Sequence, residues 1–400
     1  MKKPVTPDSH PTEHIVSADS LELIATCAFG LEKLVFDEIK QLGLWVIKKE
    51  DGRVFYEATP LDLIRSNLWL RCADRIQIKM AEFTAKTFDE LFDATFAVDW
   101  AKIIGANDSF PIQATSVKSA LHSEPAIQSI VKKAIVKKLQ SQHSTENLPE
   151  NSGVVYQIIV KSNKDHFIIS IDSSGDSLHK RGYRTQANLA PIKETLAAAL
   201  VKLSDWPGKA ADPSAYRTLI DPFCGSGTIA IEAALIAHNI APGIKRNFAF
   251  QKWPWISSLD LETAYLEARN SAKPSQKLPI YCFDIDADSL DMAKENAARA
   301  GIEHLNFKRA DFQDLDFAKF ENCTFITNPP YGERLEDYES VQELYRNLGD
   351  KFTQSKNCSL FIITADEQFP ELFGRPADKN RKLFNGNIRC YLYQYLAQPN

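Results

Sequence analysis

Residues 219–228 read Leu-Ile-Asp-Pro-Phe-Cys-Gly-Ser-Gly-Thr and combine an aspartate with a glycine-rich turn. The pattern predicts the end of a buried strand, a tight turn and a helix over 229–238. Glycine lets such a turn approach a ligand closely, and the first N–H groups of a helix have no partners within it. Asp221 stands where the strand ends, which is where ligands bind in open α/β sheets. The segment therefore predicts a small-molecule site.

The turn by itself leaves two chemistries open, because Gly225, Gly227 and Ala230 also fit the dinucleotide-binding pattern of a nicotinamide-dependent oxidoreductase. A second segment, 328–331, reads Asn-Pro-Pro-Tyr and follows the apolar run 324–327. An aspartate and glycine turn followed by Asn-Pro-Pro-Tyr resembles the class I S-adenosylmethionine-dependent methyltransferases that act on exocyclic amino groups of bases. The oxidoreductase reading explains only the glycine turn.

The Asn-Pro-Pro-Tyr segment has the groups that methyl transfer to an amine needs. The lone pair of an exocyclic amine is delocalised into the base, so the site must hold the nitrogen in line and accept hydrogen bonds as it gains charge. Asn328 Oδ1 and the carbonyl of Pro329 can do both, and the ring of proline fixes its φ. Tyr331 can stack on an extruded base, a contact worth about 1–3 kcal/mol. We predict Asn328, Pro329, Pro330 and Tyr331 as the catalytic residues.

The atom that receives the methyl group is less well defined by the motif. Carbon methylation of pyrimidines usually needs a cysteine nucleophile after the proline, and Tyr331 stands there instead. The same tetrapeptide serves guanine N2, adenine N6 and glutamine methylation. Motif chemistry therefore predicts a base amine or a planar amide.

The elements that must position these residues alternate between strands and helices from residue 217 onward, which implies a parallel sheet. Expected strands end at Asp221 and cover 280–283, 305–308, 323–327 and 360–364, with a closing hairpin over 382–384 and 388–395. We predict an α/β fold of the Rossmann-like class I methyltransferase type. Its sheet would have seven mostly parallel strands and a C-terminal antiparallel hairpin. An insert over 239–279 interrupts the alternation.

The N-terminal half has a different style. Residues 20–70 show the β-α-β-β-α order of a ferredoxin-like unit, and 71–180 repeat a mixed α+β pattern with an amphipathic helix over 126–139. Residues 1–19 have no apolar core of a signal peptide and are expected to be a disordered lead-in.

A junction links the two halves, with Leu-His-Lys-Arg-Gly-Tyr-Arg at 178–184 and Ala-Pro-Ile-Lys-Glu-Thr-Leu at 190–196. This arrangement resembles the THUMP-domain RNA methyltransferases, most closely the bacterial 23S rRNA guanine-N2 methyltransferases. The resemblance implies a ferredoxin-like domain (20–70), a THUMP RNA-binding domain (71–180) and a methyltransferase domain (185–400). It also favours guanine N2 as the target, because Asn rather than Asp stands at 328.

The resemblance implies S-adenosylmethionine as the cofactor. Asp284, at the end of the second strand of the sheet, would accept hydrogen bonds from the ribose hydroxyls. Asp311 would accept from the adenine amine, and Phe312 would offer its backbone N–H. The full set of expected cofactor contacts is Asp221, Phe223, Gly225, Gly227, Thr228, Asp284, Ile285, Asp311, Phe312, Asn328 and Glu194. Asp286 is expected to be a helix cap.

RNA is the expected partner, although the net charge of −5 argues against indiscriminate nucleic-acid binding. Local basic residues would then contact phosphates. The candidates are Lys132, Lys133, Lys137, Lys138, Lys180, Arg181, Arg184 and Arg246. The lysines alone equally suit a solvated helix face, and the aromatic neighbours of Arg246 equally suit packing on the domain wall.

Composition excludes several classes. The 400 residues are 44% hydrophobic, and no run of about 18 apolar residues predicts a membrane span. The seven cysteines form no CxxC and the eight histidines show no ligand spacing, so buried thiols in a reducing cytoplasm are expected and no metal site. A tRNA guanine-N2 methyltransferase and an inactive RNA-binding or ribosome assembly factor remain as alternatives. The sequence leaves monomer and homodimer open.

Overall fold

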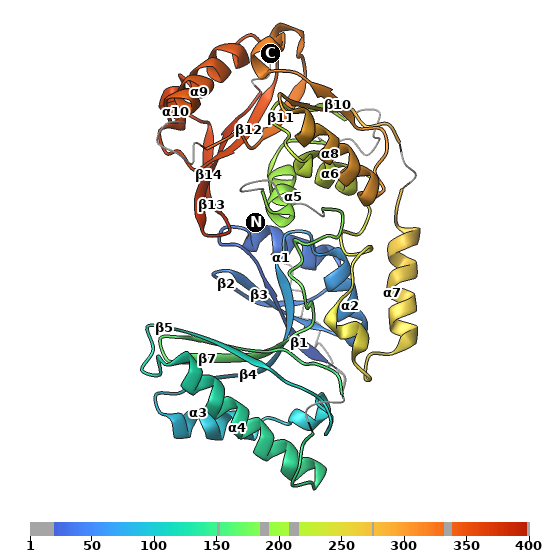
Figure 1. Ribbon diagram of the computed structural model, residues 1–400, viewed down its shortest axis with the longest axis vertical. Helices are drawn as coiled ribbons and strands as arrows, with labels where there is room; N and C mark the ends of the chain where they lie inside the picture. Colours follow the sequence, from blue (N-terminus) through green and yellow to red (C-terminus); the bar gives the residue numbers. More distant parts are fainter. Residues whose placement is uncertain are drawn as a thin grey trace, which may run out of the picture.

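The computed structural model describes residues 20–149, 153–184, 192–207, 216–273, 276–331 and 338–397. The predicted lead-in, 1–19, and the start of the predicted methyltransferase domain at 185 lie outside these ranges. The described chain forms two seven-stranded sheets stacked along the long axis (Figure 1).

The first sheet has the order β2-β3-β1-β4-β7-β6-β5. Its strands are β1 (Leu21–Thr26), β2 (Val46–Glu50), β3 (Arg53–Ala58), β4 (Arg75–Thr84), β5 (Ile112–Val117), β6 (Ile158–Asn163) and β7 (His166–Asp172). Its helices are α1 (Glu32–Gln41), α2 (Pro60–Trp69), α3 (Phe88–Ala97) and α4 (Glu124–His143). The long strand β4 pairs with β1 on one side and β7 on the other, so the two predicted N-terminal domains share one continuous sheet.

The second sheet has the order β10-β9-β8-β11-β12-β14-β13. Its strands are β8 (Thr218–Asp221), β9 (Ile280–Asp284), β10 (Asn306–Arg309), β11 (Cys323–Thr327), β12 (Ser359–Thr364), β13 (Lys379–Asn385) and β14 (Ile388–Tyr395). Its helices are α5 (Glu194–Leu203), α6 (Thr228–Ala237), α7 (Ser258–Asn270), α8 (Ala287–Ala300), α9 (Tyr338–Phe352) and α10 (Phe369–Leu372).

This sheet confirms the predicted fold class. β8 to β12 run parallel, and only the final pair β13–β14 is antiparallel to its neighbours. Every residue of β11 and β12 is buried, as expected for strands covered by helices on both faces. Helix α8 begins after the cap Asp286 and ends at Gly301, as the sequence predicts.

The described residues contain no helix that is both long enough and apolar enough to cross a bilayer. All seven cysteines are buried and free, which confirms the prediction of buried thiols.

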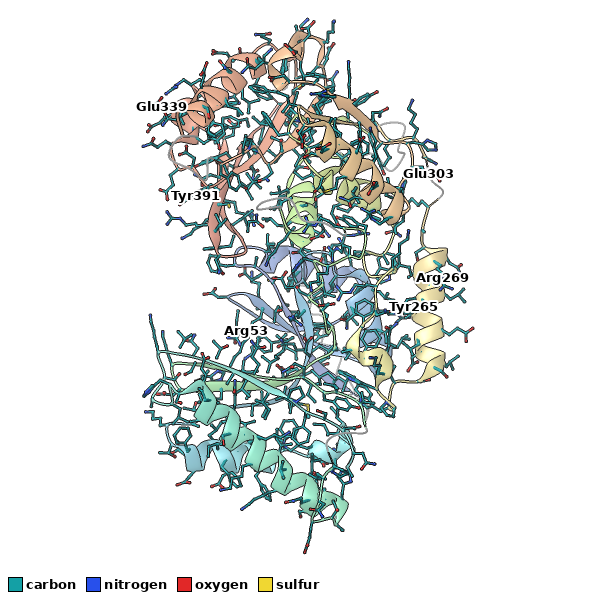
Figure 2. The ribbon with its side chains drawn as sticks, viewed as in Figure 1. Arg53, Tyr265, Arg269, Glu303, Glu339 and Tyr391 are labelled. Atoms are coloured by element: carbon teal, nitrogen blue, oxygen red, sulfur yellow. The ribbon has the colours of Figure 1, made fainter. Side chains whose placement is uncertain are left out.

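The insert over 239–279 joins the two sheets. Figure 1 shows its helix α7 running alongside α2 of the N-terminal half. The Gly243 N–H donates to the Leu68 carbonyl at 2.9 Å, and the indole of Trp253 stacks on Tyr156 with 5.0 Å between ring centroids. Tyr265 lies on the inner side of α7 (Figure 2), where its hydroxyl accepts from Gln251 at 2.9 Å. The insert therefore packs against the N-terminal half and holds the two sheets together. We call it the clasp.

We expect Trp253→Ala to lower the free energy of unfolding by about 3–5 kcal/mol, because the side chain is 2% exposed and its loss leaves a cavity at the domain junction. Urea denaturation measures the change. Leu266→Ala, on the 52% exposed side chain of the same insert, is the control and should change the value by less than about 0.5 kcal/mol. Equal losses of unfolding free energy in the two variants would contradict the role of the insert in holding the two halves together.

Candidate active site

The carboxyl ends of β8 and β11 bring the two predicted halves of the site together. The Thr327 hydroxyl, from the last residue of β11, donates to Asp221 Oδ1 at 2.6 Å. Asn328 follows directly, so the Asn-Pro-Pro-Tyr segment begins beside the aspartate that ends β8. Parallel neighbours place their carboxyl ends on the same edge of a sheet, which is why distant segments meet here.

The glycine turn after β8 leaves open space next to its backbone. Gly225 has a φ of +50°, and a Cβ built on it would meet no atom within 4 Å. Its N–H donates to Asp284 Oδ2 at 2.7 Å, which ties this turn to the end of β9. Gly227 has a φ of +78°, and its Cβ would lie 3.0 Å from the Cβ of Ala293 on α8. Gly227 is therefore needed for helix packing and shapes the turn, whereas Gly225 borders the open space.

The end of β9 presents a carboxylate and an exposed apolar side chain. Asp284 is half-buried and its Oδ1 also accepts from the Asp286 N–H at 3.0 Å, so the protein fixes its orientation. Ile285 is 60% exposed and presents an apolar surface next to Asp284. Asp286 accepts from the Ser289 N–H at 3.1 Å as the cap of α8, which confirms its predicted role.

The residues after β10 complete this edge. Asp311 is half-buried, and its Oδ1 accepts from the Gln313 N–H at 2.9 Å as in a turn-initiating aspartate. The ring of Phe312 is buried against Phe223, with 5.0 Å between centroids. Thr228 is 3% exposed and lies beside the Ser226 hydroxyl at 3.3 Å, so its side chain belongs to the inside of the turn.

The Asn-Pro-Pro-Tyr segment is held from within. The Tyr331 hydroxyl donates to Asn328 Oδ1, and the Tyr345 hydroxyl, from α9, donates to the Pro330 carbonyl at 3.2 Å. Burial raises the pKa of Tyr331 well above its ordinary value, with a further contribution from Cys390, so the phenol stays a donor. The Tyr331 ring packs partly against the core, and its stacking on a base stays a prediction.

Asp221 is unusual because it is buried and no cation among the described residues pairs with it. It is 1% exposed and accepts from the Thr327 hydroxyl and the Phe223 N–H. Burial raises the pKa of Asp221 to about 7, and the nearby Asp284 adds to the shift. A hydrogen-bond donor or a cation that came close to Asp221 would therefore favour its ionised form.

Glu194 lies in a buried polar cluster at the base of α5. Its carboxylate accepts from Arg184 Nη2 at 3.2 Å, and burial raises the pKa of Glu194 to about 7 although Arg184 opposes the shift. Arg181 is 3% exposed and donates to Glu232 at 3.4 Å and to the Leu178 carbonyl at 2.8 Å. We correct the prediction that Arg181 contacts RNA, because its guanidinium is buried.

Arg246 is likewise buried. Its Nη1 donates to the Ser177 carbonyl at 2.8 Å, and its guanidinium lies 4.9 Å from the ring centre of Phe248. Burial lowers the pKa of Arg246 to about 10. We correct its predicted contact with RNA, because this arginine ties the insert to the junction. Lys180 is exposed but paired with Asp176 at 2.8 Å.

Three of the four lysines of α4 lie near aromatic rings. Lys132 is 3.6 Å from the ring centre of Phe110, Lys137 is 5.7 Å from that of Phe92, and Lys138 lies over Phe96. Lys133 and Lys137 are exposed. The strip is therefore on the surface, and its contact with RNA stays a prediction.

Sequence reasoning missed Thr327 and Tyr345. Thr327 was taken only as the end of an apolar run, and its hydroxyl instead joins the two halves of the site. Tyr345 comes from α9, and its helical spacing indicates only a buried position. Neither has a local sequence signal.

The residues at the carboxyl ends of β8, β9 and β10 fit S-adenosylmethionine. The open space at Gly225, the oriented carboxylate of Asp284 and the exposed Ile285 suit a ribose next to an adenine. Asp311 and Phe312 stand at the end of the next strand. These residues would hold the cofactor, whose carboxylate-rich surroundings also suit a sulfonium.

Three family models cover the described architecture. They are an RlmL ferredoxin-like domain over 22–77, a THUMP domain over 85–172 and an RMKL-like methyltransferase domain over 181–394. The last alone covers more than half of the chain. The chain belongs to the RMKL-like methyltransferase family. The predicted resemblance and fold class are confirmed, and so is the cofactor, because this family depends on S-adenosylmethionine.

Relatives match along most of the chain. The Bacillus subtilis protein YpsC, whose name assigns it provisionally to the RNA methyltransferases, is 46% identical over 94% of this chain and 96% of its own. The ribosomal RNA large subunit methyltransferase K/L of Syntrophotalea carbinolica is 33% identical over 94% of this chain. This chain spans 53% of the length of that second relative.

Two solved structures show the same fold. SMU.472, named provisionally as a methyltransferase, was crystallised with S-adenosylhomocysteine. It is 43% identical with a TM-score of 0.88, over 96% of this chain and 100% of its own. A Listeria monocytogenes protein, assigned by prediction to the N6-adenine-specific DNA methylases, is 42% identical with a TM-score of 0.88. That match covers 95% of this chain and 97% of its own.

We expect Asp221→Asn to gain stability over wild type as pH rises. The raised pKa of Asp221 means that the folded state holds its proton more tightly than the unfolded state, so wild type loses stability up to about pH 7. Asparagine keeps both hydrogen-bond acceptances and does not ionise. Between pH 5 and pH 8 the unfolding free energy of the variant should rise by about 3 kcal/mol relative to wild type in urea titrations. A difference in unfolding free energy between variant and wild type that does not change with pH would contradict the raised pKa of Asp221.

Proposed function

We propose that this protein transfers a methyl group to the exocyclic N2 amine of a guanine in structured RNA, with 23S rRNA as the foremost substrate. One observation carries the proposal. The hydrogen bond from Thr327 to Asp221 places the Asn-Pro-Pro-Tyr segment beside the residues expected to bind the cofactor. The THUMP domain supports RNA, and the K/L relatives, which act on large-subunit rRNA by name, support 23S rRNA. Such a substrate would put the enzyme in the cytoplasm.

S-adenosylmethionine, when bound, supplies an electrophilic methyl group. The chain's own part in the reaction begins with binding. Asp284 accepts hydrogen bonds from vicinal hydroxyls, Ile285 packs on an apolar ring, and the backbone at Gly225 allows close approach. Asp284 and the backbone at Gly225 are already oriented by hydrogen bonds, so little order has to be gained by these groups on binding.

Asn328 and Pro329 act on the amine. Asn328 Oδ1 has two lone pairs, and the Tyr331 hydroxyl occupies one of them and fixes the amide. The second lone pair and the Pro329 carbonyl accept the two N–H groups of the amine and stabilise the charge that grows on nitrogen. Tyr345 keeps the following peptide in place through the Pro330 carbonyl. No strong general base is needed, because the methylated amine loses its extra proton readily.

The N-terminal half would position the RNA. Lys133 and Lys137 offer exposed cations on α4, and Lys132, Lys137 and Lys138 are held over aromatic rings. Contacts of this kind bind phosphates without reading sequence. Specificity for one nucleotide then comes from the shape of the RNA and from the active-site pocket.

Adenine N6 is the second candidate target, because the Listeria structure carries that assignment and Asn-Pro-Pro-Tyr serves both amines. A tRNA guanine would use the same mechanism on another polymer. An inactive assembly factor is disfavoured, because Asp221, Asp284, Asp311 and Asn328 are all in place on one sheet edge.

Transfer of tritiated methyl groups from S-adenosylmethionine to total RNA of a strain lacking this gene tests the polymer. We expect label in 23S rRNA after the RNAs are separated by size. Label confined to tRNA would move the substrate to the alternative. No label in any RNA, with S-adenosylhomocysteine still bound in calorimetry, would overturn the RNA proposal.

We expect Asn328→Ala to lower kcat by about a hundredfold or more, because it removes an acceptor that acts on the developing charge. Affinity for S-adenosylhomocysteine, measured by calorimetry, should change little. Asn270→Ala, on an exposed residue at the end of α7, is the matched control and should behave as wild type. Equal loss of kcat and of cofactor affinity in Asn328→Ala would show that its role is in cofactor binding.

A further inference from the structure

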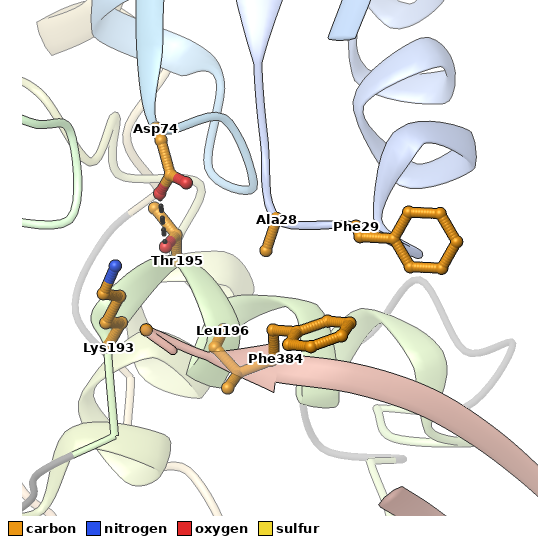
Figure 3. A pocket seen from close by; sticks show the side chains of 8 residues that line it. Ala28, Phe29, Asp74, Lys193, Thr195, Leu196 and Phe384 are labelled. Atoms are coloured by element: carbon orange, nitrogen blue, oxygen red, sulfur yellow. Dashed lines mark hydrogen bonds between the residues drawn. The ribbon is translucent and has the colours of Figure 1, made fainter. Parts of the chain in front are cut away.

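A pocket of about 260 Å³ lies at the junction of the two sheets (Figure 3). We call it the junction pocket. The β1–α1 turn contributes Phe29, the β4 approach contributes Asp74, the start of α5 contributes Lys193 and Thr195, and the β13–β14 hairpin contributes Phe384. None of the roles assigned above uses these residues.

Two aromatic rings form one end of the pocket. Phe29 is 48% exposed, and its ring meets that of Phe384 edge to face, with 6.1 Å between centroids and 82° between planes. The edge contact leaves the ring faces of Phe29 uncovered by Phe384, whereas the Lys382 ammonium lies 5.8 Å from the ring centre of Phe384. The face of an aromatic ring suits a planar base.

Charged and polar groups form the other end, as Figure 3 shows. Asp74 is fixed by its N–H, which donates to the Thr26 carbonyl at 2.6 Å. Its Oδ1 accepts from the Thr195 hydroxyl at 3.2 Å, and the other carboxyl oxygen has no donor among the described residues. Lys193 makes no ion pair within the described ranges, and its N–H donates to Asn385 Oδ1 at 3.3 Å.

The pocket is linked to the catalytic segment through the hairpin. β13 carries Phe384, and its partner β14 carries Cys390, which lies against the Tyr331 phenol. On the opposite side, Arg381 Nη1 donates to the Gly30 carbonyl at 3.2 Å and closes the junction beside Phe29. A ligand in the pocket would therefore contact both domains near the reacting base.

We propose that the junction pocket binds an unpaired nucleotide of the RNA substrate, a neighbour of the base that is methylated. Its base stacks on the ring of Phe29 and meets the ring of Phe384 at an edge, because the two ring planes are 82° apart. A base N–H donates to Asp74, and Lys193 pairs with a phosphate. The volume is somewhat below the roughly 300–1,000 Å³ of drug-sized sites, which suits one nucleobase. The inference rests on the proposed RNA substrate and adds a second point of contact to it.

Steady-state methylation of the labelled RNA fraction tests the pocket with Phe29→Ala and Phe384→Ala. Loss of one stacking contact should raise KM for RNA about tenfold, within the range of about 5 to 150-fold that base stacking allows. kcat at saturating RNA and affinity for S-adenosylhomocysteine should stay at the wild-type values. Phe384→Tyr keeps a ring and should restore KM. Tyr281→Ala, on a 39% exposed aromatic of β9, is the control.

Ultraviolet crosslinking of the full chain to the same RNA, followed by peptide mass spectrometry, is the second measurement. Nucleotide adducts on Phe29 or Phe384 are expected. Wild-type KM in both alanine variants, or crosslinks only elsewhere, would overturn the pocket and leave the proposed function standing. A fall in kcat or in cofactor affinity without a change in KM would mean that the rings only hold the domains together. Failure of wild type to methylate any RNA would overturn both proposals.

Discussion

The hydrogen bond from Thr327 to Asp221 is the contact on which the site depends. It joins the carboxyl ends of β8 and β11, two strands that are 102 residues apart when counted from Asp221 to Cys323 but adjacent in the sheet. Because Asp221 is buried and the described part of the chain places no cation beside it, this bond and the one from the Phe223 N–H compensate its desolvation. The hydrogen bond between Thr327 and Asp221 fixes the position of the glycine turn relative to the Asn-Pro-Pro-Tyr segment. Methyl donor and acceptor groups can then be placed on one rigid edge, which is the main requirement for a reaction with little acid–base chemistry.

The second constraint is the connection of this edge to the N-terminal half. The insert over 239–279 and the buried ions Arg181 and Glu232 contribute contacts at the junction of the two halves. A buried ion pair contributes little net stability, but removing one partner is costly, so it favours one arrangement of the two sheets. A fixed arrangement would matter for the proposed RNA substrate, since the proposed phosphate contacts of α4 and the amine proposed to bind at Asn328 would have to match one RNA shape. The junction pocket is lined by residues of both halves.

Much of the fold could be predicted because its signals are local. β11 matches the expected strand at 323–327, since a short apolar run is followed by proline, and α8 matches because Asp286 and Gly301 mark its ends. The roles of Arg181 and Arg246 could not be predicted, because a basic residue near aromatics looks the same in sequence whether it faces phosphate or fills a domain junction. Their burial depends on packing between segments far apart in the chain. The same holds for the partnership of Thr327 with Asp221 and for the single sheet that β4 builds from two domains.

The most direct test of the account is the position of the transferred methyl group within the nucleoside. RNA labelled by the wild-type enzyme is digested to nucleosides, and each labelled species is identified by mass spectrometry against standards. An acceptor set of Asn328 Oδ1 and the Pro329 carbonyl predicts a methyl group on an exocyclic amine, and the proposed function makes that product N2-methylguanosine. A methyl group on a ring carbon or on a ribose oxygen would contradict the account, because neither atom has N–H groups to donate to these acceptors.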